Sequence, residues 1–435
     1  MKESIKKRIE AVRRGEVPEG YRIENGYLIS DDWKTVPLNS RFTRSTQKNS
    51  TGCENVLTIS AQMGLVNQRK FYDKDIASED KSGYFLMKNG EFAYNKSYST
   101  GYPYGAIKQL TKYDEGIVSP LYICFAPKAG TNTAFYTQYF EGGRYNREIY
   151  RVAQEGARNH GLLNIAVEDF FTGILVEPSA GEQQKIAKIL ATCDRMIELK
   201  QHLVDEYKKA KKVFLRRLFP TQGVNVPELR FPGFEGEWRK CQLGELSDFI
   251  TKGATPTTYG YQWETTGIPF FRNDSIQDNR FVYGEYSFIS ETAHKALSRS
   301  EVKGDDILIA ITGDIGKVGI VPKDVIRGNI NQHMARVRII KDALPFFIYQ
   351  YLCAATMQNN YQVIKTGISM PQLSLEQIRN TEILLPSLEE QQCIASCLKN
   401  LDEAIELRLQ ELEEVQQQKK ALMQLLLTGL VRVNA

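Results

Sequence analysis

The chain has 435 residues, enough for two or three domains that each bury a hydrophobic core. Charged residues make up 25% of it and apolar residues 42%, the balance of a globular protein, and the net charge of +4 permits a polyanionic partner without requiring one. No stretch approaches the ~20 apolar residues that span a bilayer, so we expect no membrane segment. The seven cysteines are scattered and odd in number, which argues against a disulfide scaffold and favours a reducing, cytoplasmic location.

The first 32 residues are predicted to be a helical leader. They begin MKESIKKRIEAVRRGE, which is charged throughout and lacks the apolar core and cleavage site of a secretory signal. We therefore expect residues 1–32 to precede the first globular block as part of the folded chain.

Two blocks, residues 33–177 and 238–385, have a mixed α/β character. Short apolar runs such as PLYICFA (120–126), DILIAIT (306–312) and MARVRII (334–340) are typical of strands. The longer run ALPFFIYQYLCAATM, which begins at residue 343, is typical of a helix. Glycine, asparagine and aspartate separate these runs and predict turns, for example in KGATPTTYG and GDIGKVG.

One long segment occurs twice in the chain. Residues 178–203 read PSAGEQQKIAKILATCDRMIELKQHL, and residues 386–411, 208 positions later, read PSLEEQQCIASCLKNLDEAIELRLQE. The blocks before the two copies also begin alike, because the Trp33 and Leu38 pair recurs as Trp238 and Leu243. Polar positions match without a gap, so the chain is a duplication of two halves whose block interiors have diverged.

The repeated segment is predicted to be a coiled-coil helix. In both copies apolar residues recur at alternating steps of three and four, and the polar breaks at Lys200 and Lys211 match those at Arg408 and Lys419. Pro-Ser followed by Glu predicts the helix start. We expect the two copies to pair antiparallel about a pseudo-two-fold axis; the alternative is that each helix packs only on its own block. The predicted seam consists of Ile186, Leu190, Ile197, Val204, Phe214, Leu218, Ile394, Leu398, Ile405, Leu412, Leu422 and Leu426.

The sequence contains no recognisable catalytic constellation. The glycine-rich run from Gly313 to Gly319 lacks the upstream Gly and downstream Ser/Thr of a P-loop, and the four histidines are dispersed. Cys393 and Cys397 lie four apart on a predicted helix, where buried apolar packing is favoured over a zinc site because no His or second Cys pair accompanies them. We therefore predict no catalytic residue, no metal site and no cofactor in this chain.

Basic residues interleaved with aromatic and amide side chains indicate a candidate nucleic-acid surface. Arg, Lys, Asn, Gln and His read base edges, and Lys and Arg neutralise phosphates. The alternative is a solvated, tyrosine-rich surface. The candidate DNA-binding residues are Lys96, Ser97, Arg144 and Arg147 in the first block, and Lys252, Arg272, Asn273, Gln332, His333 and Lys365 in the second.

These features together resemble the specificity (S) subunit of type I restriction-modification systems. The resemblance rests on two copies of P-S-x-x-E-Q-Q followed by an I-x-x-x-L helix, on the LRFPGF-x-x-x-W junction at 229–238, and on two dissimilar blocks that each start W-x-x-x-x-L. It implies a mixed α/β (α+β) fold with two globular target-recognition domains separated by two long antiparallel helices, in a pseudo-two-fold internal repeat. The implied organisation is a helical leader (1–32), target-recognition domain 1 (33–177), spacer helix 1 (178–219), a linker (220–237), target-recognition domain 2 (238–385), and spacer helix 2 with the C-terminus (386–435).

The resemblance also implies a function and a set of partners. Each globular domain would read one half of a bipartite site in double-stranded DNA, and the paired helices would set the half-site spacing and dock two methyltransferase subunits. Those partners would bind S-adenosylmethionine and methylate adenine at N6, and two motor-nuclease subunits using ATP and Mg would cleave unmodified DNA in the prokaryotic cytoplasm. This chain itself would be a non-catalytic subunit. The alternative is a non-enzymatic coiled-coil adaptor with two protein-binding domains.

The leader helix also has an expected place in this arrangement. We hypothesise that it lies near the C-terminus and completes a circular arrangement of the two halves. Residues 1–15 packed only on the first block would contradict this hypothesis.

Overall fold

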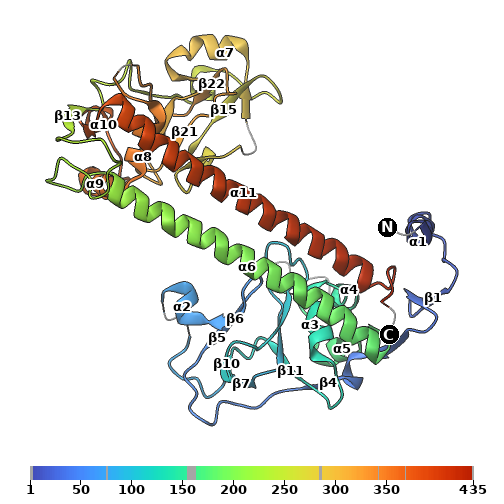
Figure 1. Cartoon of the computed structure of the whole chain (residues 1–435). Coiled ribbons are helices and arrows are strands. Elements are labelled where there is room, and N and C mark those ends of the chain that lie inside the picture. Colours follow the sequence, from blue (N-terminus) through green and yellow to red (C-terminus); the bar gives the residue numbers. More distant parts are fainter. Residues whose placement is uncertain are drawn as a thin grey trace. The chain divides into compact units, whose positions relative to one another are not determined.

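The computed structural model describes residues 3–74, 77–153, 163–283, 287–340, 342–367 and 369–433. It divides into two compact units, which are unit 1 (Met1–Leu199 with Glu411–Ala435) and unit 2 (Lys200–Gln410). Each unit combines one mixed α/β globular part with sections of two long helices, α6 (Ala180–Leu218) and α11 (Leu388–Leu426) (Figure 1). The predicted fold class is therefore confirmed, while the finer domain boundaries stay predictions.

The globular part of unit 1 is built on a four-stranded antiparallel sheet of order β4–β11–β8–β9. Its core is aromatic, because the Phe42 ring meets Phe92, Phe125 and Tyr136 edge to face at centroid distances of 5.5, 5.3 and 5.2 Å. The predicted strand at 120–126 is observed as β11. The strands are β1 (Tyr21–Glu24), β2 (Tyr27–Ser30), β3 (Lys34–Pro37), β4 (Phe42–Arg44), β5 (Leu57–Ser60), β6 (Gly64–Asn67), β7 (Phe85–Lys88), β8 (Phe92–Asn95), β9 (Ala106–Gln109), β10 (Glu115–Val118), β11 (Ile123–Pro127) and β12 (Ile174–Glu177).

Short helices cover this sheet, and small strand pairs surround it. The hairpins β1–β2 and β5–β6 and the pairs β7–β10 and β3–β12 are all antiparallel. The helices are α1 (Glu3–Arg13), α2 (Gln68–Tyr72), α3 (Thr133–Glu141), α4 (Asn146–Val152) and α5 (Val167–Thr172).

Unit 2 contains two four-stranded sheets, β14–β23–β20–β21 and β18–β15–β22–β19. The predicted strands at 306–312 and 334–340 are observed as β20 and β23. The elements are β13 (Arg239–Gln242), β14 (Thr251–Lys252), β15 (Ile268–Phe271), β16 (Ile276–Gln277), β17 (Arg280–Phe281), β18 (Ser287–Ile289), β19 (Glu301–Val302), β20 (Ile307–Ala310), β21 (Val318–Ile320), β22 (Gly328–Ile330), β23 (Met334–Val337) and β24 (Glu382–Leu385), with helices α7 (Glu291–Ala296), α8 (Pro345–Cys353), α9 (Ala355–Ile364) and α10 (Leu375–Arg379).

The single helix predicted from residue 343 to residue 357 is instead two helices. The backbone of Ala354 is extended (ψ 144°), which ends α8 at Cys353 and starts α9 at Ala355. The buried face of α8 packs in the core of unit 2, so tertiary packing overrides a periodicity that continues through the break.

The two long helices are equivalent in detail. Each has 39 residues, and α11 begins and ends 208 positions after α6 begins and ends. Both start in the same way, because the hydroxyls of Ser179 and Ser387 accept hydrogen bonds from the third following backbone N–H, at 3.3 Å in each copy. The side chains of Gln183 and Gln391 then reach back to the carbonyl of the preceding proline, at 3.1 and 3.0 Å. The P-S-x-x-E-Q motif is therefore a helix-start device used twice.

Ion pairs explain two of the polar breaks in the predicted seam. Lys419 pairs with Asp194 in unit 1, and Lys211 pairs with Asp402 at 2.7 Å in unit 2. A glutamine of the globular part joins each pair, because Gln138 donates to Asp194 and Gln350 donates to Asp402, both at 2.7 Å. From Asp194 to Lys211 the residue number rises along α6, while that of the partner on α11 falls from Lys419 to Asp402. The helix sections therefore pair antiparallel, as predicted.

The seam residues also contact the globular cores. Ile186 and Leu190 are fully buried in one cluster with Met423 and Leu426 of the other helix and with the aromatic core of unit 1. The helices therefore pair with each other and also pack on their own blocks, so the two arrangements considered from the sequence occur together. Of the twelve predicted seam residues nine are buried, and the three half-buried ones are Ile197, Phe214 and Leu422.

The predicted helical leader, residues 1–32, is helical in α1, whereas residues 21–30 form the β1–β2 hairpin. Helix α1 lies beside the C-terminal segment, as hypothesised, and the circular arrangement stays a prediction. Arg8 donates to the carbonyl of Leu430 at 2.7 Å and lies over the Tyr21 ring, whose hydroxyl donates to the carbonyl of Gly429. Arg432 then forms ion pairs with Asp32 and Glu182, at 2.6 and 2.7 Å. In unit 2 the linker residue Arg230 binds the equivalent carboxylate, Glu390, at 2.8 Å. The C-terminal segment thus does in unit 1 what the inter-helix linker does in unit 2.

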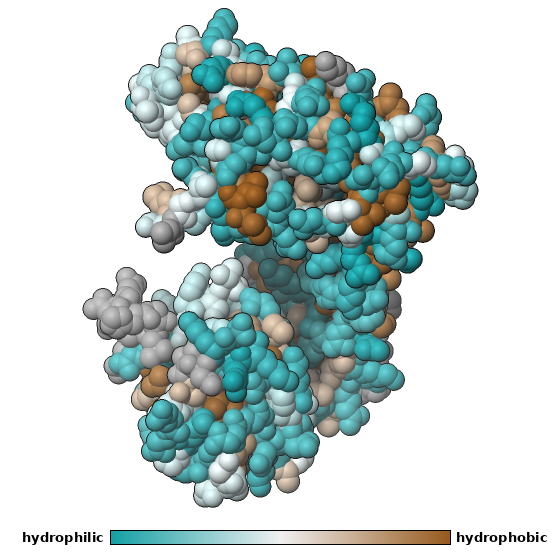
Figure 2. Space-filling view, turned by 90° about the vertical axis from the view of Figure 1, so that its left-hand side faces the viewer, coloured by the Kyte–Doolittle hydropathy of each residue, from teal (hydrophilic) through white to brown (hydrophobic). Residues whose placement is uncertain are grey.

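Within the described part of the chain, no helix is both long and apolar enough to cross a membrane. The face shown in Figure 2 is mostly hydrophilic, with apolar residues in separate patches.

Candidate nucleic-acid interface

Several strand ends of unit 2 meet at one edge. Strand β23 pairs antiparallel with both β14 and β20, so Lys252 and Ala310, at the ends of those strands, lie opposite Ala335 and Met334 at the start of β23. Strand β15 runs parallel to β22, which brings the residues after Phe271 close to those after β22. The loops that follow β14, β15, β20 and β22 therefore come together.

Five side chains from these loops, here called the rim cluster, form one hydrogen-bonded chain. The Thr255 hydroxyl donates to Oε1 of Gln332 (2.5 Å), whose Nε2 lies 3.0 Å from Nε2 of His333. Nδ1 of His333 is 2.6 Å from Oγ1 of Thr312, and Nδ2 of Asn273 donates to the Thr312 carbonyl at 2.8 Å. The structure thus brings together three predicted site residues, Asn273, Gln332 and His333, with two threonines that the sequence reasoning missed. Their signal was the turn-rich stretches KGATPTTYG and TGDIG, each of which follows a strand.

The three basic residues predicted in this block lie next to the rim cluster along the chain or across a strand pair. Arg272 precedes Asn273, lies over the Trp263 ring (4.7 Å to the centroid) and donates to the Ser287 hydroxyl at 2.6 Å. Lys252 is exposed on β14. Lys365 is exposed where α9 ends and donates to Gln362 at 2.9 Å.

A closed loop follows Lys365. Thr366 and Gln372 exchange backbone hydrogen bonds at 2.9 and 2.8 Å, and Gln372 forms a β-bridge with Thr312 of the rim cluster. Met370 in this loop is 80% exposed. The edge therefore combines donors, acceptors and positive charge on several loops.

The predicted residues of unit 1 divide between two places. Lys96 and Ser97 follow β8, where the Ser97 N–H donates to the Asn95 side chain and the Lys96 carbonyl accepts from Leu163. Arg144 precedes α4 and Arg147 lies on it, and among the described contacts none joins these arginines to the loop after β8.

Both arginines face the β1–β2 hairpin. Arg147 donates to the Gly26 carbonyl and covers the Tyr27 ring (4.6 Å to the centroid). Arg144 and Arg147 also line a cavity of about 290 Å³ together with Leu430 of the C-terminal segment. Arg147 therefore has a structural partner, and no sequence pattern reveals it because Gly26 and Arg147 are far apart in the chain.

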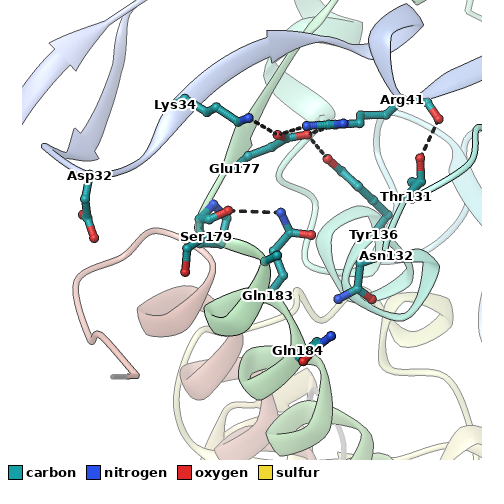
Figure 3. Close-up of a pocket in the computed structure, with 13 residues that line it drawn as sticks. Asp32, Lys34, Arg41, Thr131, Asn132, Tyr136, Glu177, Ser179, Gln183 and Gln184 are labelled. Atoms are coloured by element: carbon teal, nitrogen blue, oxygen red, sulfur yellow. Dashed lines mark hydrogen bonds and ion pairs between the residues drawn. The ribbon is translucent and has the colours of Figure 1, made fainter. Parts of the chain in front are cut away.

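A cavity of about 620 Å³ lies at the start of α6 in unit 1 (Figure 3). Its central group is Glu177, which is fully buried and accepts two hydrogen bonds from Arg41 at 2.6 and 2.7 Å. The Tyr136 hydroxyl also donates to Glu177, and the Lys34 ammonium lies 3.7 Å away. Burial opposes ionisation of Glu177, but the hydrogen bonds from Arg41 and Tyr136 outweigh it and hold its pKa below the usual range. The carboxylate is fully engaged and is not available as a base or metal ligand.

Unit 2 has apolar residues at the equivalent positions. The match follows from shared contacts, because the hydroxyl of Tyr139 accepts from the backbone of Val176 at 3.1 Å and that of Tyr351 accepts from Leu384 at 3.2 Å. The residues that replace Arg41, Tyr136 and Glu177 are Leu246, Ile348 and Leu385, all buried in the core of unit 2. The ionic cluster is thus a feature of one half only.

Neither cysteine of the predicted Cys393/Cys397 pair lies in a metal-binding cluster among the described residues, where no group of three or more His, Cys, Asp or Glu side chains converges. Cys393 is exposed, while Cys397 is half-buried against the core of unit 2, and burial raises its pKa.

The structure defines a class of two-domain protein in which two α/β globular parts are built on an antiparallel pair of equivalent long helices. Comparison with known proteins shows which proteins of this kind the chain resembles. Residues 235–417 match the type I restriction modification DNA specificity domain. The chain is 28% identical over 267 residues to the type I restriction enzyme MjaVIII specificity subunit of Methanocaldococcus jannaschii, which covers 59% of this chain and 62% of that protein. It is 31% identical over 138 residues to the EcoBI specificity subunit of Escherichia coli, covering 31% and 28% of the two chains.

A solved structure has the same fold. The type I restriction-modification S subunit from M. genitalium superposes with a TM-score of 0.54 at 14% sequence identity, covering 93% of this chain and 97% of the other. Through the match over residues 235–417 and these relatives, the chain is similar to type I restriction-modification specificity subunits. Its alignment spans about three-fifths of the length of the M. jannaschii relative.

Proposed function

We propose that this chain is the DNA sequence-specificity subunit of a type I restriction-modification complex. Each globular part would read one half of a bipartite site in double-stranded DNA. The observation that carries the proposal is the combination of two equivalent 39-residue helices with two globular parts whose loop surfaces differ. Two equivalent helices that space two unlike globular parts suit a DNA target whose two half-sites differ in sequence.

The helix pair would act as a spacer and as a docking element. A 39-residue helix is roughly 58 Å long at about 1.5 Å per residue, and half-buried ion pairs fix the register of its partner. We propose that this pair sets the half-site separation and docks two methyltransferase subunits, and that the complex also recruits two motor-nuclease subunits. The chain would contribute no catalytic residue. Methylation of adenine N6 with S-adenosylmethionine, and cleavage driven by ATP with Mg, would be carried out by those partners.

The rim cluster of unit 2 supports DNA as the ligand. Amide, imidazole and hydroxyl groups on converging loops match the donors and acceptors of base edges, and Lys252, Arg272 and Lys365 supply positive charge beside them. In unit 1, Lys96 and Ser97 would serve the equivalent purpose.

The test uses the chain assembled with its methyltransferase. Arg272→Ala should weaken recognition of the half-site read by unit 2 by about 1–3 kcal/mol. The base preference at the other half-site should stay unchanged. Arg147→Ala, which removes a cation held by the β1–β2 hairpin, is the matched control. Equal loss at both half-sites, or no loss, would remove Arg272 from the interface. A methylome of cells with and without the gene should show one bipartite motif that disappears; if none does, the proposed function is wrong.

A further inference from the structure

The loop between β22 and β23, residues 331–333, is held rigidly from both sides. The Asn331 backbone donates to the carbonyl of Phe271 at 3.3 Å and accepts from the N–H of Gly253 at 3.1 Å. The Asn331 side chain accepts from the N–H of His333 at 3.1 Å. The backbone of Gly253 passes so close that a Cβ there would lie 1.8 Å from the Ile330 carbonyl oxygen, so only glycine fits. The side chain between these anchors, Gln332, is therefore presented from a fixed backbone.

Gln332 is exposed, yet both ends of its amide are hydrogen-bonded. Oε1 accepts from Thr255, and Nε2 donates to Nε2 of His333. A primary amide has two acceptor positions on its oxygen and two protons on its nitrogen. One acceptor position and one proton thus remain unused, on a side chain whose rotation is restrained at both ends.

His333 holds one end of the amide in place. Its Nε2 accepts from Gln332, so its proton lies on Nδ1 and is donated to Oγ1 of Thr312 at 2.6 Å. Thr312 is held in turn by Asn273, which donates to its carbonyl, and by the bridge to Gln372. Rotating the amide of Gln332 by half a turn keeps the network satisfied when His333 carries its proton on Nε2 and the Thr255 hydroxyl accepts, so in either orientation both ends of the amide are held and one donor and one acceptor stay free.

An oriented amide with one free donor and one free acceptor complements only one base in the major groove. Adenine presents an acceptor at N7 and a donor at N6, whereas guanine presents two acceptors, cytosine a single donor, and thymine an acceptor beside a methyl group. We propose that Gln332 reads an adenine in the half-site bound by unit 2, and that His333 and Thr255 are positioning residues that hold its amide in place. This inference rests on the proposed function and assigns one base within it.

The experiment measures base preference rather than affinity alone. The chain assembled with its methyltransferase is used to select bound duplexes from a library in which both half-sites are randomised. The unchanged protein should prefer adenine at one position by about 10- to 100-fold, the range of a bidentate amide contact. Gln332→Glu should move the preference at that position toward cytosine, because a carboxylate only accepts hydrogen bonds. Gln201→Glu, the same change at an exposed site on α6, should leave every position unchanged.

The positioning role has its own readout. His333→Phe keeps an aromatic ring at this position but cannot accept a hydrogen bond from Gln332. It should therefore reduce the adenine preference at the same position, while the base preferences at the other positions stay unchanged. A uniform loss of affinity with an unchanged base profile would overturn the positioning role.

The adenine assignment and the proposed function fail in different ways. If Gln332→Glu alters no position, or alters one where the unchanged protein prefers a base other than adenine, the assignment is wrong although sequence-specific binding persists. If the unchanged complex selects no sequence at all, the proposed function itself fails.

Discussion

The buried ion cluster at the start of α6 offers the sharpest test of how unit 1 is stabilised. Replacing Glu177 with Leu, the residue at the equivalent position of unit 2, would leave the Arg41 guanidinium and the Tyr136 hydroxyl without their acceptor. Removing one partner of a buried pair typically costs 3–5 kcal/mol, and Arg41 is 32% exposed, so water recovers part of this loss. We expect unit 1 to lose about 2–4 kcal/mol, which corresponds to roughly 4–16 °C in the unfolding midpoint for a unit of this size.

The matched variant replaces the whole cluster. Arg41→Leu, Tyr136→Phe and Glu177→Leu together remove the charges and the hydroxyl, and unit 2 already places Leu246, Ile348 and Leu385 at these positions. Because no buried charge is left unpaired, the triple variant should recover most of the stability lost by Glu177→Leu.

Hydrogen exchange resolved by peptide can assign these changes to unit 1, since peptides from unit 2 serve as an internal control. The reasoning is refuted if Glu177→Leu leaves exchange in unit 1 unchanged. It is equally refuted if the triple variant is as unstable as the single one, because the loss would then come from packing rather than from stranded polar groups.

Three further changes test the helix pair and the C-terminal segment. Lys419→Asp should destabilise unit 1 by about 1–3 kcal/mol because it places two carboxylates together, and adding Asp194→Lys should restore most of the loss in a urea titration; failure of the double variant to recover would argue against the antiparallel register. Hydrogen bonds from Arg432 lower the pKa of Asp32 to about 2 from 3.8, so the stabilisation from this pair is present above about pH 4 and is lost as the pH falls toward 2. The difference in denaturant midpoint between the unchanged protein and Arg432→Ala should therefore shrink between pH 5 and pH 2, and a constant difference would contradict the assignment. Gly429→Ala should cost about 1–2 kcal/mol, because φ is +73° and the added Cβ would sit 3.2 Å from a buried tryptophan ring; an unchanged midpoint in thermal unfolding would show that this turn relaxes freely.

Local periodicity was enough to predict the helix pair. Matching seams and matching breaks over two copies specify helices of equal length, and their start motif predicts where each begins. The sequence also shows Lys211 and Lys419 only as interruptions. Their roles became visible once the antiparallel register placed Asp402 and Asp194 across from them, because an ion pair between distant segments leaves no periodic trace.

The predicted DNA-binding residues illustrate the same division. Residue type listed Asn273, Gln332 and His333 among the ten candidate residues, and β-strand pairing brings these three into one hydrogen-bonded chain. Residue type alone also made Arg147 a candidate DNA-binding residue. In the fold it binds the β1–β2 hairpin, which is far away in the sequence.

The sequence by itself determined the duplication, the two long helices and the mixed α/β class, because these depend on repetition and on spacing along the chain. Only the tertiary structure decided which polar side chains share an edge, which cation is already paired, and that one half carries a buried ionic cluster where the other carries leucine and isoleucine. Such contacts join residues tens to hundreds of positions apart, and their energies depend on burial and partner geometry that no local pattern encodes.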